Sequence, residues 1–257
     1  GRYCGAEVDF VDINSKTWNI DIDKLSEKLA SACESGKLPK VIVPVHFAGQ
    51  PTEQEAIWEL AQRYNFRVLE DASHAIGALR NGEPVGSCRW SDITVFSFHP
   101  VKIITTAEGG LATTNSEELA ERMRLLRSHG VTRNQKLMTK DIEGPWHYQQ
   151  IDLGFNYRMT ELQAALGVSQ MKRLDEFVAK RHSLQERYDL LLKNLPIIKP
   201  FQAENTYSAL HLYPIQIVLN KVQKSRKQIF NELRDSGIGV NVHYMPIHMQ
   251  PYYQQFG

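Results

Sequence analysis

Two stretches in the middle of the chain decide the fold: RVLEDASHAIGA at residues 67–78 and SDITVFSFHPVKIITTAEGGLATT at residues 91–114. Each opens with an apolar run of strand length that ends in small and polar residues. The pattern predicts strands at residues 67–70, 91–97 and 110–114. Amphipathic helical patterns lie on either side, and strands that alternate with helices favour a largely parallel, doubly wound α/β sheet.

The rest of the chain extends this alternation in both directions. Further strands are expected at residues 6–11, 41–45, 211–219 and 240–244. Apolar residues recur at helical spacing over residues 22–33, 52–64, 116–128, 160–177 (continuing after a break to about 195) and 225–236. Capping-box spacing at Thr52–Glu55 and Thr160–Gln163 indicates two helix starts. The texture changes beyond Pro200, so we expect a large α/β domain over residues 1–178 and part of a smaller α+β domain over residues 179–257.

Length and charge narrow the class of protein. A chain of 257 residues is long enough to form one or two domains with a sizeable core. Its 30 Lys and Arg residues balance 29 Asp and Glu residues, which argues against nucleic acid or an anionic membrane surface as a partner. No apolar run approaches the length that spans a bilayer, and the first residues lack the pattern of a signal peptide.

The spacing of cysteine and histidine argues against a disulfide framework and against a metal site. Cys4, Cys33 and Cys88 are odd in number and form no CxxC pair, as expected of reduced thiols in a cytoplasmic protein. His243 and His248 lie near the C-terminus at a spacing that fits no standard zinc motif. We therefore expect no bound metal.

Polar residues gather where two predicted strands end, and open α/β sheets bind their ligands at such ends. Asp71 follows the first strand, where its alternative role is that of a helix N-cap. Lys102 follows the second among apolar and small residues, where burial would lower its pKa and make the amine nucleophilic. Taken in isolation, Lys102 is better explained as a solvated loop lysine. The segment GFNYRMTELQAA at residues 154–165 places Asn156 before a helix start, and capping alone explains Thr160 but not the polar residues beside it.

Together these residues favour one cofactor. Pyridoxal phosphate (PLP) needs a carboxylate that keeps its pyridine nitrogen protonated, a lysine that forms a Schiff base, and hydroxyl or amide groups for its phosphate. Asp71 supplies the carboxylate and Lys102 the amine, and Ser97, five residues before the lysine, supplies a hydroxyl. The sequence therefore predicts a PLP site at the carboxyl ends of the strands.

The motifs that carry these residues resemble those of a known family. EDASHAIGA, SDITVFSFHPVKIITTAEGG, LRSHG and GFNYRMTELQAALG are similar in order and spacing to the DegT/DnrJ/EryC1/StrS family of sugar aminotransferases. The resemblance runs over essentially the whole chain and implies a fold-type I PLP-dependent transferase. Lys102 then stands at the position of the catalytic Schiff-base lysine, and Asp71 at that of the carboxylate paired with the pyridinium nitrogen. His74 matches the neighbour of the cofactor O3′, and Ser97 matches a phosphate-binding hydroxyl.

The resemblance also implies partners and a substrate class. Asn156 matches an amide that reaches the cofactor phosphate of the neighbouring subunit, which implies a homodimer with shared active sites. Family members with histidine in place of the lysine are dehydratases, so Lys102 favours an aminotransferase. The implied substrate is a nucleotide-linked 4-keto-6-deoxy sugar, with L-glutamate as amino donor. The stretch at residues 144–177 is similar to the branch that aminates a UDP-linked sugar on the route to pseudaminic acid.

Two departures from the family pattern leave alternatives open. The Gly- and Thr/Ser-rich helix start that binds the phosphate in the family has no counterpart before Ala6, and the family continues beyond HYMPIHMQPYY at residues 243–253. We therefore expect the chain to lack both ends of the family's length, including the N-terminal part of the PLP-binding domain at residues 1–178. The alternatives are an inactive fragment that keeps the fold or binds PLP weakly, a regulator or oligomerisation module, and an aminotransferase for a different nucleotide keto sugar.

Overall fold

The computed structural model describes residues 1–256, and within them a mixed central sheet joins four strands in the order β1–β2–β5–β6. β1, β2 and β5 run parallel to one another, and β6 runs antiparallel to β5. The expected α/β class and the mostly parallel sheet are confirmed. The bounds of these strands are Val41–Ile42 for β1, Arg67–Asp71 for β2, Ile93–Ser97 for β5 and Gly110–Thr113 for β6.

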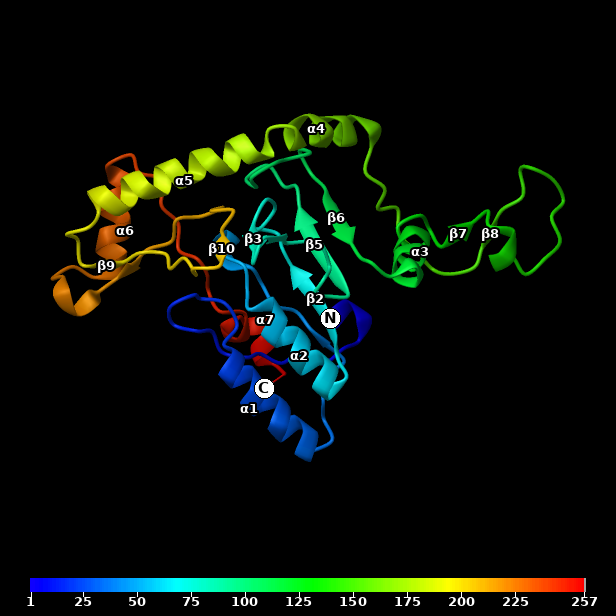
Figure 1. Cartoon of the computed structure of the whole chain (residues 1–257), viewed down its shortest axis with the longest axis horizontal. Coiled ribbons are helices and arrows are strands. Elements are labelled where there is room, and N and C mark those ends of the chain that lie inside the picture. Colours follow the sequence, from blue (N-terminus) through cyan, green and yellow to red (C-terminus); the bar gives the residue numbers. More distant parts are fainter. Residues whose placement is uncertain (257) are drawn as a thin grey trace.

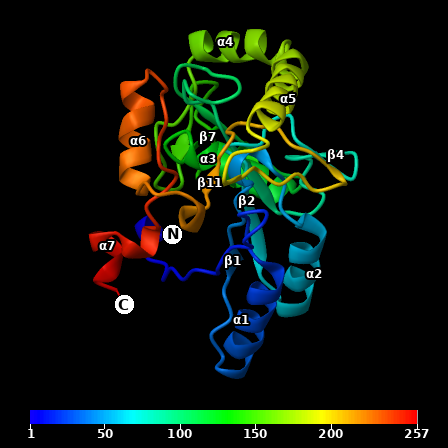
Figure 2. The same ribbon diagram turned by 90° about the vertical axis from the view of Figure 1, so that its left-hand side faces the viewer.

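Helices lie at two opposite ends of the molecule (Figures 1 and 2). At one end α1 (Ile22–Glu34) and α2 (Gln54–Tyr64) lie side by side. At the other end α4 (Glu161–Met171) and α5 (Leu174–Leu191) follow one another across the top of Figure 1. The carboxyl ends of β2 and β5 lie between these two layers, which makes room for a site there.

Shorter elements complete the chain. An arm extends to the right of Figure 1 from α3 through the β7–β8 pair, while α6 lies at the opposite side and α7 near the middle of the view. The remaining helices and strands are α3 (Glu117–Leu126), α6 (Arg226–Asp235), α7 (Pro251–Gln254), β3 (Leu79–Arg80), β4 (Glu83–Pro84), β7 (Val131–Thr132), β8 (Gln149–Gln150), β9 (Ile197–Ile198), β10 (Thr206–Tyr207) and β11 (Gln216–Ile217). The 3-10 turns are η1 (Arg2–Cys4), η2 (Phe47–Gly49), η3 (Gln135–Leu137), η4 (Leu219–Lys221) and η5 (Ile247–Met249).

Two apolar clusters hold the layers together. The first joins α1 and α2 to β2 through Leu25, Leu29, Ile57, Leu60, Ala61, Phe66 and Val68. The second joins α5 to the strand ends and their loops through Ala72, Ala75, Ala78, Val85, Phe96, Phe98, Ile103, Ile104, Val178 and Ala209. Because this second cluster contains residues on both sides of Lys102 and directly after Asp71, packing against α5 fixes the loops that carry both side chains.

Gly77 allows α5 to approach the strand ends. Its φ of +85° lies in the left-handed region, and a Cβ there would lie 3.0 Å from Val178 Cγ2. Glycine therefore serves both the turn after β2 and the close helix contact.

Four of the expected strands are shorter than predicted or absent. Residues 6–11 and 240–244 form no strand, because neither segment has a neighbouring strand to pair with. In place of 211–219 only β11 forms, paired with β9. β1 covers two residues of the expected 41–45, with one further bridge from Val45 to Asp71. Val41 in β1 and Val43 and Val45 after it are exposed.

Helices form at each of the predicted helical ranges, but one of the two predicted capping boxes does not form. Thr160 and Gln163 form the predicted capping box at the start of α4. The Thr52–Glu55 box is wrong: α2 has Glu53 as its N-cap, without a side-chain cap, and Thr52 Oγ1 is buried with no hydrogen-bond partner within residues 1–256. The expected domain boundary at 178/179 falls inside the continuous helix α5, and the division into two domains stays a prediction.

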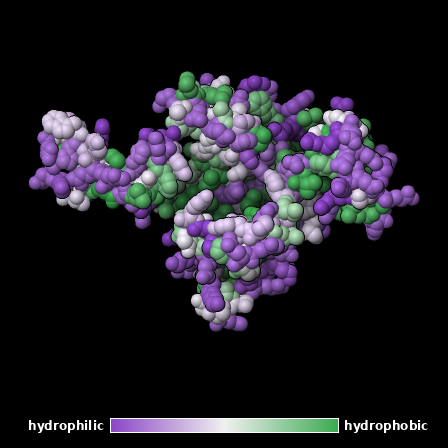
Figure 3. All heavy atoms as spheres, turned by 180° about the vertical axis from the view of Figure 1, so that it is seen from behind, coloured by the Kyte–Doolittle hydropathy of each residue, from purple (hydrophilic) through white to green (hydrophobic). Residues whose placement is uncertain are grey.

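The surface has a depression between the end that carries α4 and α5 and the end that carries α1 and α2 (Figure 3). Seen from behind, a depression separates the upper helical layer from the lower lobe, and apolar atoms line part of its wall (Figure 3). None of the helices within residues 1–256 is long and apolar enough to cross a bilayer.

Candidate active site

Asp71 lies at the carboxyl end of β2 and is half-buried. Its backbone pairs with Val95 of the neighbouring parallel strand. Its Oδ1 accepts the Ser73 N–H at 3.0 Å, which closes a turn rather than a helix. The alternative interpretation of Asp71 as a helix N-cap is therefore wrong, because no helix follows it.

Ser97 occupies the matching position at the end of β5. It lies opposite Gly110 of β6, and its Oγ accepts the His99 N–H at a long 3.4 Å. The hydroxyl hydrogen is not used in any hydrogen bond within the described residues. Ser97 is thus available to donate to a ligand at the same sheet edge as Asp71.

Lys102 sits on a loop that is tied back to the end of β5. The Lys102 N–H donates to His99 O at 2.9 Å, and Thr106 N–H and Thr105 Oγ1 both donate to Phe98 O at 3.0 Å. The side chains of Ile103 and Ile104 anchor the loop in the core. Burial lowers the pKa of Lys102, and the negative charge of Asp71 opposes that shift. Lys102 is thus partly buried rather than fully solvated.

Asp71 and Lys102 interact electrostatically without forming an ion pair. Asp71 raises the pKa of Lys102 by its charge alone, with no hydrogen bond between them. In PLP enzymes a flat ring separates the carboxylate at the pyridine nitrogen from the lysine amine at the opposite side. The lack of a direct contact between Asp71 and Lys102 is compatible with a ring between them.

His74 follows the turn after β2 and is buried. Its Nδ1 accepts the Ala48 N–H at 3.3 Å. Burial lowers the pKa of His74 to about 4, with the positive charge of Lys102 acting in the same direction and Asp71 against it. His74 is consequently neutral at physiological pH.

A second histidine lies at this site, and no pattern in the sequence predicts it. The ring of His211 lies 4.5 Å from that of His74, centroid to centroid. Burial lowers the pKa of His211 to about 3, helped by His74 and Lys102, and its Nδ1 has no hydrogen-bond partner within residues 1–256. His211 falls in the segment expected to be a strand, so its position depends on long-range packing.

His243 and Tyr244 also interact with this group. His243 lowers the pKa of His74. Burial raises the pKa of Tyr244, and the charge of Asp71 acts in the same direction.

Asn156 is not part of this cluster. It is exposed, forms an antiparallel bridge with Ser128, and precedes α4. The structure thus brings together Asp71, His74 and Lys102, with Ser97 at the adjacent strand end, and leaves Asn156 on the surface.

A buried polar network supports the site from below. Glu70 is 1% exposed, and its carboxylate accepts hydrogen bonds from Gln54, Ser91 and Thr94. His46 Nε2 lies 3.5 Å from Glu70 Oε1, and its Nδ1 accepts the Thr52 N–H. Burial acts to raise the pKa of Glu70, but the interaction with His46, together with the hydrogen bonds from Thr94 and Gln54, outweighs burial and lowers the pKa. A charged Glu70 therefore ties β2 to β5 and to the loop after β1.

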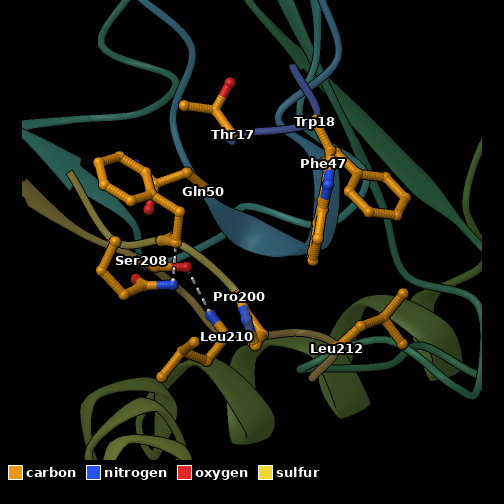
Figure 4. Close-up of a pocket in the computed structure, with 11 residues that line it drawn as sticks. Thr17, Trp18, Phe47, Gln50, Pro200, Ser208, Leu210 and Leu212 are labelled. Carbon is orange, nitrogen blue, oxygen red and sulfur yellow. Dashed lines mark hydrogen bonds between the residues drawn. The ribbon is translucent and has the colours of Figure 1, made fainter. Parts of the chain in front are cut away.

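A pocket borders the cluster on the side of Phe47, whose ring lies 6.2 Å from that of His74. In Figure 4, Trp18 and Phe47 stand on one side of the pocket and Gln50 and Ser208 on the other. No charged side chain is among its described lining residues, which are Thr17, Trp18, Phe47, Ala48, Gln50, Pro200, Phe201, Gln202, Ser208, Leu210 and Leu212. The pocket is uncharged but narrow, with a volume of about 10 Å³.

The residues present fit PLP. Lys102 offers an amine of lowered pKa, Asp71 an opposing carboxylate, and Ser97 a free hydroxyl, all at one sheet edge. No group of three or more potential metal ligands occurs in the part of the chain that the structure describes. The combination is typical of α/β enzymes that bind PLP at the carboxyl ends of their strands.

The chain belongs to the DegT/DnrJ/EryC1/StrS aminotransferase family, whose model matches residues 2–257. The family comprises PLP-dependent sugar aminotransferases. The chain is 37% identical, over 98% of its length, to the UDP-4-amino-4,6-dideoxy-N-acetyl-beta-L-altrosamine transaminase of Campylobacter jejuni, and it spans 63% of that protein.

Solved structures agree. Helicobacter pylori PseC, an aminotransferase of pseudaminic acid biosynthesis, superposes with a TM-score of 0.86 at 34% identity; the match covers 99% of this chain and 64% of that one. The PLP form of a putative sugar aminotransferase from Streptococcus pneumoniae, Spr1654, superposes with a TM-score of 0.84 at 29% identity, covering 100% of this chain and 66% of that one. The chain thus spans less than two thirds of the curated relatives it matches.

Proposed function

We propose that the protein transfers an amino group from L-glutamate to the 4-keto group of a nucleotide-linked 6-deoxy sugar, with PLP as cofactor. The observation that carries this proposal is the placement of three side chains: Asp71 and Ser97 end the neighbouring parallel strands β2 and β5, and Lys102 lies on the loop that follows β5. A UDP-linked substrate of the pseudaminic acid route is the specific form that the similarity to the Campylobacter and Helicobacter enzymes favours. An aminotransferase for another nucleotide keto sugar is the alternative within the family.

The residues have distinct roles in this proposal. Bound PLP supplies an electron sink that makes a neighbouring C–H bond acidic. Lys102 Nζ binds the cofactor covalently and then carries protons as general base and acid, for which a pKa lowered toward neutrality is suitable. Asp71 holds a positive charge on the pyridine nitrogen. His74 contacts the cofactor O3′, and Ser97 binds its phosphate.

We further propose that the active site is shared within a homodimer. Asn156 is exposed and bridges to Ser128, and a residue that serves the neighbouring subunit's cofactor would also be exposed on the separate chain. Large apolar side chains near it also face solvent: Leu153 is 83% exposed, Tyr157 74% and Leu162 86%. Such a surface is typical of an interface. The division into a PLP-binding domain at residues 1–178 and a smaller domain at 179–257, and a cytoplasmic location, belong to the same proposal.

The proposal is tested by the visible absorption spectrum of the chain mixed with PLP. We expect wild type and Lys37→Ala to show the same new band after dialysis, because Lys37 is an exposed lysine outside the site. Lys102→Ala should lack that band. An equal band in Lys102→Ala would overturn the assignment of the lysine. Complete loss of PLP from wild type on dialysis would favour the alternative that this chain keeps the fold without retaining the cofactor.

A further inference from the structure

The turn at residues 46–52 makes a direct contact with the candidate site through a backbone amide. Ala48 N–H donates to His74 Nδ1 at 3.3 Å. A ring nitrogen that accepts a hydrogen bond carries no proton, so in a neutral imidazole the proton lies on the other nitrogen. The contact therefore determines the tautomer of His74.

The amide of Ala48 points at His74 because the backbone takes an unusual conformation there. Ala48 has φ = +57°, in the left-handed region that residues other than glycine rarely adopt. Such a conformation persists only when its surroundings enforce it. The next residue, Gly49, has φ = +98°, and a Cβ there would lie 2.7 Å from Leu210 N.

Three sets of contacts enforce this turn. Asn19, 4% exposed, accepts the Phe47 N–H on its Oδ1 at 2.9 Å and donates from Nδ2 to Gln50 O at 2.9 Å. Ala209 N–H donates to Gly49 O at 3.0 Å. His46 Nδ1 accepts the Thr52 N–H at 3.0 Å, which links the turn to the buried Glu70 network. Asn19 thus bridges both ends of the turn from another part of the chain.

The opposite nitrogen of His74 is free to act on a ligand. Within residues 1–256 Nε2 makes no hydrogen bond, and, in contrast to His211 Nδ1, it is not sealed from solvent. The groups that affect the pKa of His74 through their charge are Lys102, Asp71 and His243. The ring of His211 lies 4.5 Å from that of His74, centroid to centroid. Nε2 therefore belongs to the same space as the lysine and the carboxylate.

We propose that the Ala48 amide locks His74 in the Nε2–H tautomer, so that His74 offers a hydrogen-bond donor to its ligand and does not act as a base. Asn19 is the positioning residue that maintains this lock. Under the proposed function, on which only this last step rests, the acceptor is an anionic ring oxygen of the cofactor, and the donated hydrogen bond stabilises its negative charge.

The lock is tested on the cofactor-free chain by long-range proton–nitrogen NMR of its labelled histidines at neutral pH. We expect His74 to show an unprotonated Nδ1 and a protonated Nε2, with no detectable Nδ1–H form. A protonated Nδ1, or averaged shifts from a mixture of tautomers, would overturn the proposal. His74→Gln, lacking the imidazole signals, identifies the resonances.

Two variants test the role of Asn19. Asn19→Ala should give averaged tautomer signals at His74, while Asn115→Ala should leave them as in wild type. Asn115 is a matched control because its Nδ2 also donates to two backbone carbonyls, those of Ser87 and Cys88, at a distance from the turn. Equal changes in both variants, or none in Asn19→Ala, would contradict the positioning role. Should Asn19→Ala fail to fold, Ala48→Gly keeps the N–H in a residue suited to its φ, and its His74 signals must match wild type.

Adding PLP separates this inference from the proposed function. A shift of the His74 Nε2 signal on addition of PLP supports both. Nε2–H signals that are present but insensitive to PLP would leave the lock intact and contradict the contact between His74 and the cofactor.

Discussion

The Asp71 carboxylate raises the pKa of the Lys102 amine without touching it, while burial lowers that pKa. The two side chains come from the ends of neighbouring structural units, β2 and the loop after β5, and the parallel pairing of these strands brings them to one edge. The strand register and the packing against α5 therefore set the distance on which the candidate chemistry depends.

Removing the charge of Asp71 should lower the pKa of Lys102 further. Asp71→Asn eliminates the one contribution that raises it and leaves burial unopposed. The pKa is measured from the pH dependence of the rate at which Lys102 reacts with an amine-modifying reagent in the cofactor-free chain. Asp141→Asn, an exposed aspartate elsewhere, serves as control and should leave the pKa unchanged. An unchanged pKa in Asp71→Asn would show that the two groups do not sense each other.

Glu70→Gln should destabilise the chain by about 1.5–3 kcal/mol at neutral pH, because it removes hydrogen bonds to a buried charge. The pKa of Glu70 is below its ordinary value of 4.5 in the folded chain. The stabilisation that ionised Glu70 provides is therefore complete above the pKa of this residue in the unfolded chain. It is lost as the pH falls through the lower pKa of Glu70 in the folded chain. Urea unfolding of wild type and variant should differ most near neutrality and converge in acid. Exposed Glu7→Gln should match wild type throughout, and a Glu70→Gln that also does so would rule out the network's role.

Gly49→Ala should cost more stability than Gly237→Ala. Both glycines have left-handed backbone, φ +98° and φ +79°, so each alanine incurs the conformational cost of roughly 1–2 kcal/mol. Only at Gly49 does the new Cβ also meet backbone, at 2.7 Å from Leu210 N, whereas nothing lies within 4 Å at Gly237. The comparison of the two unfolding free energies isolates the close approach. Equal losses would mean that the contact between the 46–52 turn and residues 209–212 is loose.

Ser97→Ala should weaken PLP binding about tenfold or more, since a hydrogen bond to a charged group contributes roughly 1.5–3 kcal/mol. The affinity is obtained by titrating the chain with PLP and following protein fluorescence. Ser183→Ala, on the exposed face of α5, is the control, because its hydroxyl only bonds within the helix. An affinity for PLP that is the same in both variants would remove Ser97 from the phosphate site.

Local pattern was sufficient for the parts of the fold that local forces decide. The periodicity of α1, α3 and α6, the capping box at Thr160, and the apolar runs of β2 and β5 all form as predicted. The expected strands at 6–11 and 240–244 fail because a strand needs a neighbour, and nothing in their own sequence specifies one. Thr52 misled because its spacing to Glu55 fits a cap, while the helix starts one residue later.

The same division applies to the site. The positions of Asp71 and Ser97 at strand ends and of Lys102 on the loop after β5 could be predicted from sequence, because the apolar runs of β2 and β5 are recognisable. His211 and Asn19 could not, because each reaches the site through contacts with residues far along the chain. The protonation state of His74 likewise depends on the backbone of Ala48, which no sequence pattern reveals.

The most direct measurement is the position of the covalent bond to PLP. The chain is incubated with PLP, reduced with borohydride, digested, and mapped by mass spectrometry. We predict one pyridoxyl group per chain, on Lys102, with Lys37 and the other exposed lysines unmodified at stoichiometric PLP. Modification spread over surface lysines, with Lys102 unmodified, would contradict the proposal that this lysine and Asp71 form a PLP site.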